Sequence, residues 1–195
     1  GQQTKKVKSE AANAKNLEQA GDVKIVIDGG TLTVDAEGDG LDANGSIEIN
    51  GGTVVVNGPT SGANAALDYD DNAKLNGGTV LFVDNGQMTM GFGSDSSQAF
   101  LMASVQGTAG TTVEVVDSSG KTVASLKASK SFSTVLISSP DIKDGEKYTI
   151  KVGSNSTTAT ASKQAANIGG GPGGGQPGQG APGGQPGQGG RPGGR

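Results

Sequence analysis

Three copies of one motif recur between residues 23 and 95, and they constrain the fold more than any other feature of the sequence. The copies are Asp28-Gly29-Gly30-Thr31, Asn50-Gly51-Gly52-Thr53 and Asn76-Gly77-Gly78-Thr79, at offsets of 22 and 26 residues. Apolar and polar residues alternate on both sides of each copy, so each flank predicts a half-buried strand. Positions one repeat apart are equivalent: Ile25, Ile47 and Ala73; Ile27, Ile49 and Leu75; Leu32, Val54 and Val80; Val34, Val56 and Phe82.

The repeat is compatible with two arrangements of strands. Asn-Gly between alternating runs is typical of antiparallel hairpins. A constant offset favours stacked coils, with each apolar residue above its equivalent, and about 22 residues suit one circuit of a parallel β-helix. The Gly-Gly pair lets the chain turn at positive φ. We therefore expect about three coils over residues 23–95, with Asp28, Asn50 and Asn76 stacked and their amides bonding backbone groups of neighbouring coils.

Composition divides the rest of the chain. Residues 1–22 are basic and then Ala-rich, and predict either a polar arm or one short helix. Residues 96–155 predict a small antiparallel β subdomain that covers an exposed edge of the coils. Residues 156–195 contain Gln-Pro-Gly-Gln-Gly twice and predict a flexible Gly/Pro/Gln-rich tail. The predicted strands of the subdomain are 99–104, 111–116, 121–126, 132–138 and 147–152, and the predicted fold class is all-β.

The residue types present exclude several kinds of chemistry. The chain has no Cys and no His, which removes disulfides, thiol nucleophiles, imidazole bases and thiolate or imidazole zinc sites. Between residues 22 and 95, twelve acids face only Lys24 and Lys74. Such a surface repels nucleic acid and attracts cations, so we expect no nucleic-acid partner. No apolar run approaches the ~18 residues of a membrane span.

Two acidic loops, residues 35–42 and residues 68–71, are the candidate site. Calcium prefers six to eight oxygen ligands from carboxylates, amides and carbonyls, and acids flanked by glycine let several oxygens converge. The alternative is that these acids only fill solvated turns. Tyr69 is compatible with a core position or with a platform for a ligand. The predicted metal ligands are Asp35, Glu37, Asp39, Asp42, Asp68, Asp70 and Asp71, and the predicted ligand-binding residues are Tyr69, Asn44 and Asn72.

Several motifs together resemble a known family. They are Asp28-Gly29-Gly30-Thr31, Gly38-Asp39-Gly40-Leu41-Asp42, Asn44-Gly45-Ser46-Ile47, Asn50-Gly51-Gly52-Thr53, Asn57-Gly58-Pro59-Thr60-Ser61, Ala66-Leu67-Asp68-Tyr69-Asp70, Asp117-Ser118-Ser119-Gly120, Ser138-Ser139-Pro140 and Gly145-Glu146-Lys147-Tyr148-Thr149. Residues 23–153 thereby resemble the secreted bacterial carbohydrate-binding domain-containing proteins. The resemblance implies a right-handed parallel β-helix, bound calcium, a secreted or cell-surface location and affinity for plant-type or acidic polysaccharides. By the same resemblance Asp39, Asp42, Asp68 and Asp70 are the ion-site candidates.

These observations favour a binding protein over an enzyme. A β-helix polysaccharide lyase pairs calcium with a basic residue, and residues 21–98 offer only Lys24 and Lys74. Only one aromatic residue, Tyr69, lies near the acidic loops, so we expect binding through an ion bridge, in which a calcium ion held by the protein also binds uronate carboxylates. We expect a non-catalytic polysaccharide-binding module. The alternative is a self-assembling subunit of an extracellular filament or surface matrix, built by end-to-end stacking of the chain on itself.

Overall fold

A computed structural model describes residues 23–164 of the chain, and this part is all-β. The predictions for residues 1–22 and for the tail beyond residue 164 lie outside the described residues. No helix in the described part is long and apolar enough to cross a membrane. The strands are β1 Lys24–Ile27, β2 Thr31–Asp35, β3 Leu41–Ala43, β4 Ser46–Ile49, β5 Thr53–Asn57, β6 Leu67–Tyr69, β7 Asn72–Leu75, β8 Thr79–Asp84, β9 Leu101–Gly107, β10 Thr112–Val116, β11 Thr122–Lys127, β12 Phe132–Ser138, β13 Lys147–Val152 and β14 Asn155–Thr160.

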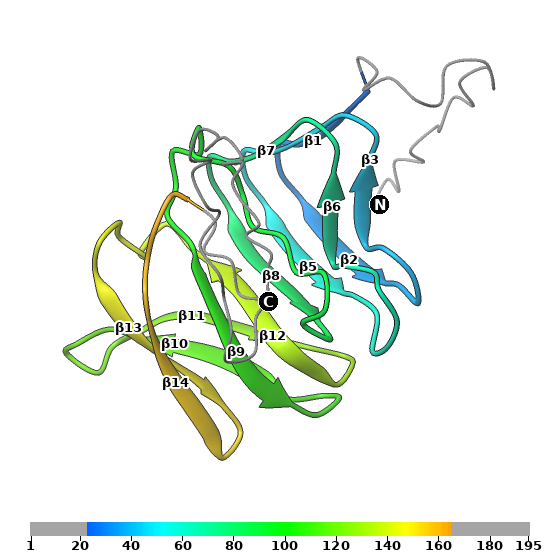
Figure 1. Cartoon of the computed structure of the whole chain (residues 1–195). Helices are drawn as coiled ribbons and strands as arrows, with labels where there is room; N and C mark the ends of the chain where they lie inside the picture. The colour runs from blue at the N-terminus through cyan, green and yellow to red at the C-terminus, as the bar shows by residue number, and fades with distance from the viewer. Residues whose placement is uncertain (1–22, 165–195) are drawn as a thin grey trace, which may run out of the picture.

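The first eight strands pair in parallel with strands one repeat away (Figure 1). The three parallel rows are β1-β4-β7, β2-β5-β8 and β3-β6. Ile25 lies beside Ile47 and Ile47 beside Ala73, and all four predicted sets of equivalent apolar positions are in register in the same way. The hairpin alternative is wrong for these strands, because none of β1 to β8 pairs with its neighbour in sequence.

The Gly-Gly corners form a column, as predicted. Gly30, Gly52 and Gly78 have φ of 83°, 88° and 90°, which favours glycine. The residues that precede the corners also stack. The Asn50 Nδ2 donates to Asp28 Oδ1 at 2.8 Å, and the Asn76 Nδ2 donates to Asn50 Oδ1 at 2.9 Å. The prediction that these amides bond backbone groups holds only for Asn76, whose Oδ1 also accepts from the Ser97 N–H at 3.4 Å, because along the column Asn50 and Asn76 instead bond the side chain one repeat earlier.

The chain itself covers the C-terminal ends of two of the three parallel rows. β12 pairs antiparallel with β8, and β9 pairs with β12, which gives the five-stranded order β2-β5-β8-β12-β9. Beside β7, the Gly93 N–H donates to the Ala73 carbonyl at 2.7 Å and the Gln98 N–H to the Leu75 carbonyl at 3.0 Å. These bonds satisfy strand edges that would otherwise be open, which is the role that the sequence predicts for residues 96–155.

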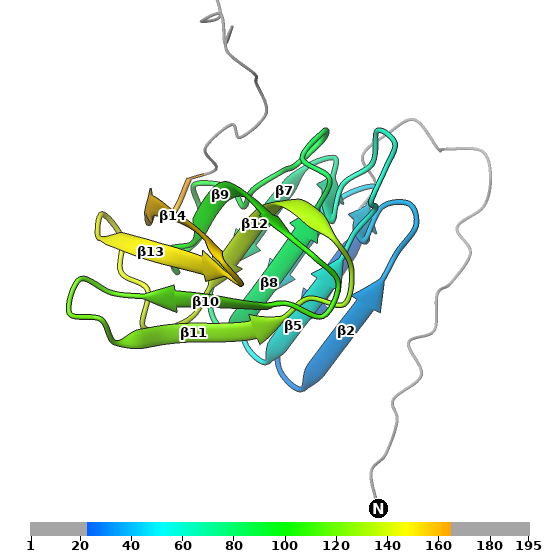
Figure 2. The ribbon, with the colours of Figure 1, turned by 90° about the horizontal axis from the view of Figure 1, so that it is seen from below.

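A second sheet, β11-β10-β13-β14, packs across the five-stranded sheet (Figure 2). The strands β5, β8 and β12 of the central sheet are consequently buried on both faces, whereas the outer face of β2 is exposed. Val54 and Val56 point into the core enclosed by the parallel rows, whereas Val55 points into the core shared with the second sheet. The half-buried prediction for residues 53–57 and 79–83 is therefore wrong. A near-continuous apolar run is typical of a strand that is covered on both sides.

The region after residue 95 is antiparallel, as predicted, but it is not separate from the parallel rows. β9 and β12 belong to the same sheet as β2, β5 and β8, and Leu81 of β8 shares a core with Ile150 of β13. The change at residue 95 is thus a change in strand direction rather than a boundary between two cores. The predicted tail also begins too early, because residues 155–160 form β14, which pairs with β13 along its whole length.

Candidate cation site

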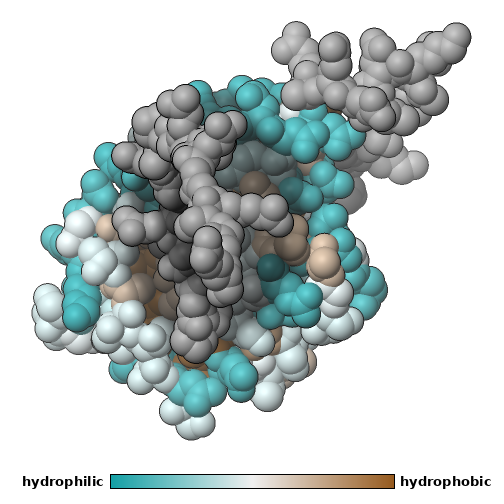
Figure 3. All heavy atoms as spheres, viewed as in Figure 1, coloured by the Kyte–Doolittle hydropathy of each residue, from teal (hydrophilic) through white to brown (hydrophobic). Residues whose placement is uncertain are grey.

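The row β3-β6 carries two acidic residues that the structure brings side by side. In-register pairing sets Asp42 beside Asp68, while Leu41, Ala43 and Leu67 on the opposite face are buried. Neighbouring strands lie about 4.8 Å apart, so the two carboxylates leave the same face of adjacent strands. In Figure 3 the part of the molecule where Figure 1 draws β3 and β6 is mostly teal, which marks hydrophilic residues.

Electrostatics connects these two acids to two others. Burial raises the pKa of Asp68 above its ordinary value, and the negative charges of Asp39, Asp42 and Asp70 raise it further. A raised pKa means that the ionised carboxyl is disfavoured where it stands. A bound cation would relieve that cost, since it offsets both the repulsion and the lost hydration. We call Asp39, Asp42, Asp68 and Asp70 the acidic face.

Hydrogen bonds fix the loops that present the acidic face. Asp39 Oδ1 accepts from the Ala65 N–H at 2.8 Å, which ties the loop before β3 to the loop before β6. The Gly40 N–H donates to the Ala65 carbonyl at 2.9 Å. The Asp70 N–H donates to the Ala43 carbonyl at 3.2 Å. Two loops that are 26 residues apart in sequence are thereby held side by side.

Three of the predicted metal ligands are occupied elsewhere. Asp35 Oδ1 accepts from the Ser129 hydroxyl at 2.7 Å, and Glu37 forms an ion pair with Lys130 at 2.9 Å. Asp71 Oδ2 accepts from the Ser46 hydroxyl at 2.8 Å, beside β4. The seven acids therefore do not converge on one point. Within residues 23–164 no three carboxylates form a group tight enough to be recognised as a metal site.

The predicted ligand-binding residues are also separated. Tyr69 is half-buried, and its ring packs against the core enclosed by the parallel rows. Its hydroxyl donates to the Gly91 carbonyl at 2.7 Å, so its position is that of a core residue. Burial raises the pKa of this hydroxyl. Asn72 belongs to β7 in the row β1-β4-β7, and its Nδ2 donates to Asp95 Oδ2 at 3.2 Å. Asn44 is exposed at the turn between β3 and β4.

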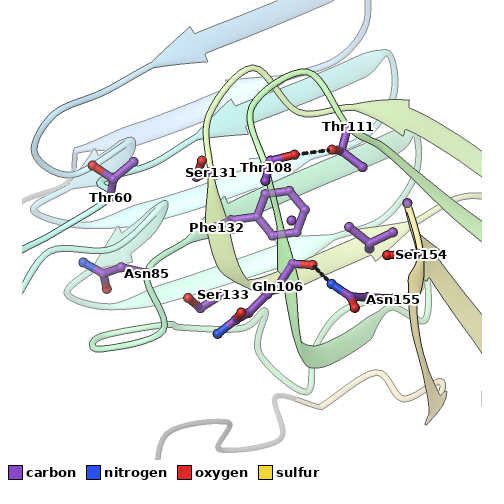
Figure 4. Close-up of a pocket in the computed structure, with 13 residues that line it drawn as sticks. Thr60, Asn85, Gln106, Thr108, Thr111, Ser131, Phe132, Ser133, Ser154 and Asn155 are labelled. Carbon is purple, nitrogen blue, oxygen red and sulfur yellow. Dashed lines mark hydrogen bonds between the residues drawn. The ribbon is translucent and has the colours of Figure 1, made fainter.

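The structure also contains a polar pocket that sequence reasoning missed (Figure 4). Its walls come from the loops after β5 and β8, the ends of β9 and β12, and the turn between β13 and β14. No spacing rule connects these segments, because only the packing of the second sheet brings them together. The richness of the segments in Ser, Thr and Asn was the one available signal, and it is equally typical of ordinary turns.

Comparison with known proteins gave no matching protein-family model, no matching curated protein and no matching solved structure. The resemblance to carbohydrate-binding domain-containing proteins therefore stays a prediction. Arguments about function rest on the geometry of the chain itself.

Proposed function

We propose that this chain is a non-catalytic polysaccharide-binding module, secreted or at the cell surface, whose acidic face holds calcium. In this proposal the three parallel rows are the faces of a short right-handed parallel β-helix of about three coils. The observation that carries the proposal is the in-register pairing of Asp42 with Asp68, where burial and then the repulsion among neighbouring acids raise the pKa of Asp68. Acids held at such a cost are a natural place for a divalent cation.

The proposed ligand is an acidic polysaccharide. A protein surface with many carboxylates repels uronates unless a cation lies between the two sets of charges. Calcium accepts more oxygen ligands than two or three carboxylates provide, so its remaining positions are available to carboxylates and hydroxyls of a sugar. Binding would then need calcium and would fall steeply with chelator, whereas neutral glucans would gain little from the ion.

The positions of the lysines support a role without catalysis. Lys24 pairs with Glu48 on the row β1-β4-β7, and Lys74 lies 3.9 Å from Asp95 on the same side. Neither lysine is on the row that carries Asp42 and Asp68. A lyase reaction needs a base beside the ion-bound uronate, so this arrangement favours binding over proton abstraction.

The self-assembling alternative lacks a specific observation in its favour. End-to-end stacking needs two open strand edges that fit each other. Within the described residues, β8 is covered by β12, and β7 is covered by the segment from residue 93 to residue 98. The C-terminal ends of two of the three rows are therefore not available for another copy. We do not propose the filament as a second function.

Thermal melting tests the ion. We expect the full chain to melt at a higher temperature in calcium than in chelator, because a ligand that binds only the folded state adds about 2.7 kcal/mol at a concentration 100 times its Kd. The Asp68→Asn variant should lose most of this gain. Asp141→Asn, which removes an exposed acid far from the acidic face in sequence, is the matched control and should keep it. Equal melting temperatures of the unmodified chain in calcium and in chelator would reject a calcium site.

Retention on insoluble polysaccharide tests the ligand. We expect calcium-dependent retention on pectate, little retention on neutral glucan, and release from pectate by chelator. Asp68→Asn should be retained less than Asp141→Asn. A protein that binds calcium but is retained on neither material would keep the ion site and remove the polysaccharide from the proposal.

A further inference from the structure

The polar pocket introduced above has a volume of about 420 Å³. This lies within the usual range of small-molecule sites, roughly 300–1,000 Å³. It opens between the five-stranded sheet and the turn that joins β13 to β14, whereas the acidic face is on the separate row β3-β6. The pocket is thus built from other elements than the proposed calcium site.

The lining of the pocket is polar and uncharged. Nine of the thirteen lining residues are Ser, Thr, Asn or Gln, and none is Asp, Glu, Lys or Arg. This contrasts with the chain as a whole, in which 17% of residues are charged. Hydroxyl and amide side chains both donate and accept hydrogen bonds, so they match a ligand whose own groups do both. A charged ligand would lose hydration here without meeting an opposite charge.

Some of these side chains are committed to the protein and others are available. Asn155 Nδ2 donates to the Gln106 carbonyl at 2.9 Å, and the hydroxyls of Thr108 and Thr111 bond each other at 3.1 Å (Figure 4). The first bond ties β9 to the start of β14, and the second lies within the turn between β9 and β10. Within residues 23–164 the side chains of Gln106, Ser131 and Ser133 make no hydrogen bond of their own and line the same hollow, so they can bind a ligand.

The floor of the pocket is rigid. The Phe132 ring is 4% exposed, and Figure 4 shows it in the middle of the labelled residues. It lies over Gly107, its cross-strand partner, where a Cβ atom would collide with the ring. The Val152 side chain beside it is 2% exposed. A preformed floor lowers the ordering cost of binding.

We propose that this pocket binds an uncharged, polyhydroxylated ligand, namely a neutral sugar unit of mono- or disaccharide size. The inference goes beyond the calcium-dependent function, because it needs neither the acidic face nor an ion. Sugar hydroxyls would exchange hydrogen bonds with Gln106, Ser131 and Ser133, above a floor that the buried Phe132 and Val152 side chains hold rigid. A neutral peptide is the competing occupant, but the pocket offers no exposed large apolar side chain to anchor one.

Titration by NMR tests the pocket. The isotopically labelled full chain would be titrated in chelator with cellobiose, xylobiose, mannobiose and lactose, and separately with digalacturonate and a neutral Ser/Gly peptide. We expect at least one neutral disaccharide to shift the amide signals of residues 106–108 and 131–133, while digalacturonate shifts none of them. Ser131→Trp, which fills the hollow, should weaken that binding at least tenfold. Ser125→Trp on β11, outside the pocket, is the matched control and should leave it unchanged.

Each remaining outcome overturns the proposal. Failure of all four neutral disaccharides to shift these signals at tens of millimolar removes it, and so does equal binding by Ser131→Trp and Ser125→Trp. Binding of the peptide in place of the sugars assigns the pocket to a different ligand. Because chelator is present throughout, a failure here leaves the calcium-dependent retention on pectate intact, and a failure of that retention leaves this result intact.

Discussion

At the scale of single residues, the polar side chains of this chain divide into structural and available groups. Asp84 is 3% exposed, yet its carboxylate accepts from the Ala66 N–H, the Gly86 N–H and the Thr89 hydroxyl. Asn57 is fully buried and joins the Val34 carbonyl to the Ser129 N–H. Such residues hold loops in place, since buried polar groups must be paired. Asp68 differs, because its partial burial and the negative charges around it raise the free energy of its ionised form.

The raised pKa of Asp68 gives a prediction with a definite sign. An acid whose pKa is raised by folding binds its proton more tightly in the folded chain, so its ionisation lowers stability as the pH rises through the raised pKa. In chelator at pH 7 we expect Asp68→Asn to be more stable than the unmodified chain by about 0.5 kcal/mol, the size of a partly solvated charge interaction. Below pH ~3.9, where the carboxyl is protonated in both states, the difference should vanish.

Urea unfolding at neutral and acidic pH measures this difference. Asp141→Asn serves again as control, and we expect its stability relative to the unmodified chain to change less between the two conditions. If Asp68→Asn is less stable than the unmodified chain in chelator at pH 7, the carboxylate is stabilising and the acidic face has been misread.

At the scale of elements, the corners between strands set how closely the repeats stack. Gly52 has φ of 88°, and a Cβ atom there would lie 2.6 Å from the Gly30 carbonyl oxygen and 2.8 Å from the Gly29 carbonyl carbon. These neighbours are backbone and cannot rotate away. Gly120, in the turn between β10 and β11, has nearly the same φ of 84° but no atom within 4 Å of such a Cβ. Both positions need a positive φ, but only Gly52 also lacks the space for a Cβ atom.

Alanine substitutions at these two positions distinguish the free-energy cost of a positive φ from the cost of a steric clash. We expect Gly120→Ala to lower the free energy of unfolding by about 1–2 kcal/mol, the cost of a left-handed conformation. Gly52→Ala should lose a further 1–3 kcal/mol or so, because the repeats must also move apart. Chemical unfolding of both variants measures the difference. Equal losses would show that the corners are spaced loosely enough to accept a methyl group.

At the scale of the whole molecule, one sheet serves two cores. Leu136 of β12 points into the core enclosed by the parallel rows. Its neighbours Val135 and Ile137 point into the core under the second sheet. Neither core is complete without the central strands. Removing either half would expose apolar side chains that are now fully buried, so we expect the described part to unfold as one unit.

The two tyrosines allow a direct measurement of this cooperativity. The chain has no Trp and two Tyr, of which Tyr69 packs against the core enclosed by the parallel rows and Tyr148 belongs to the other core. In Tyr69→Phe the remaining fluorescence reports Tyr148, and in Tyr148→Phe it reports Tyr69. Within each variant we expect the fluorescence midpoint to coincide with the midpoint from circular dichroism, which follows all strands. A fluorescence midpoint that departs from the other in either variant would indicate two independently unfolding units.

The parallel rows were predictable because their signal is local and repeated. The Gly-Gly corners and the alternating positions around them fix the register that pairs Leu32 with Val54 and Val80. The second core was not predictable in this way. Val55 and Leu81 differ little in type from their inward-facing neighbours, and what covers them, β10 and β13, follows from pairings 30 or more residues away.

The site was predictable only in part, for a related reason. The register of β3 with β6 was implied by the repeat, and it places Asp42 beside Asp68. Closeness in sequence groups Asp35 and Glu37 with the first acidic loop and Asp71 with the second. Asp35 and Glu37 instead meet Ser129 and Lys130, in a loop more than 90 residues away. The polar pocket depends on the same long-range packing and left no pattern in the sequence.

The antiparallel pairing of β8 with β12 ends the parallel row on one side, so further repeats can be added only on the other side. A duplicated circuit of 22 residues, the offset between the first two corners, could be spliced upstream of β7 and would lengthen the rows without disturbing that pairing. The acids on the lengthened face would then increase in number while the polar pocket kept its shape. The length of polysaccharide that the acidic face contacts could thus change while the ligand of the polar pocket stays the same.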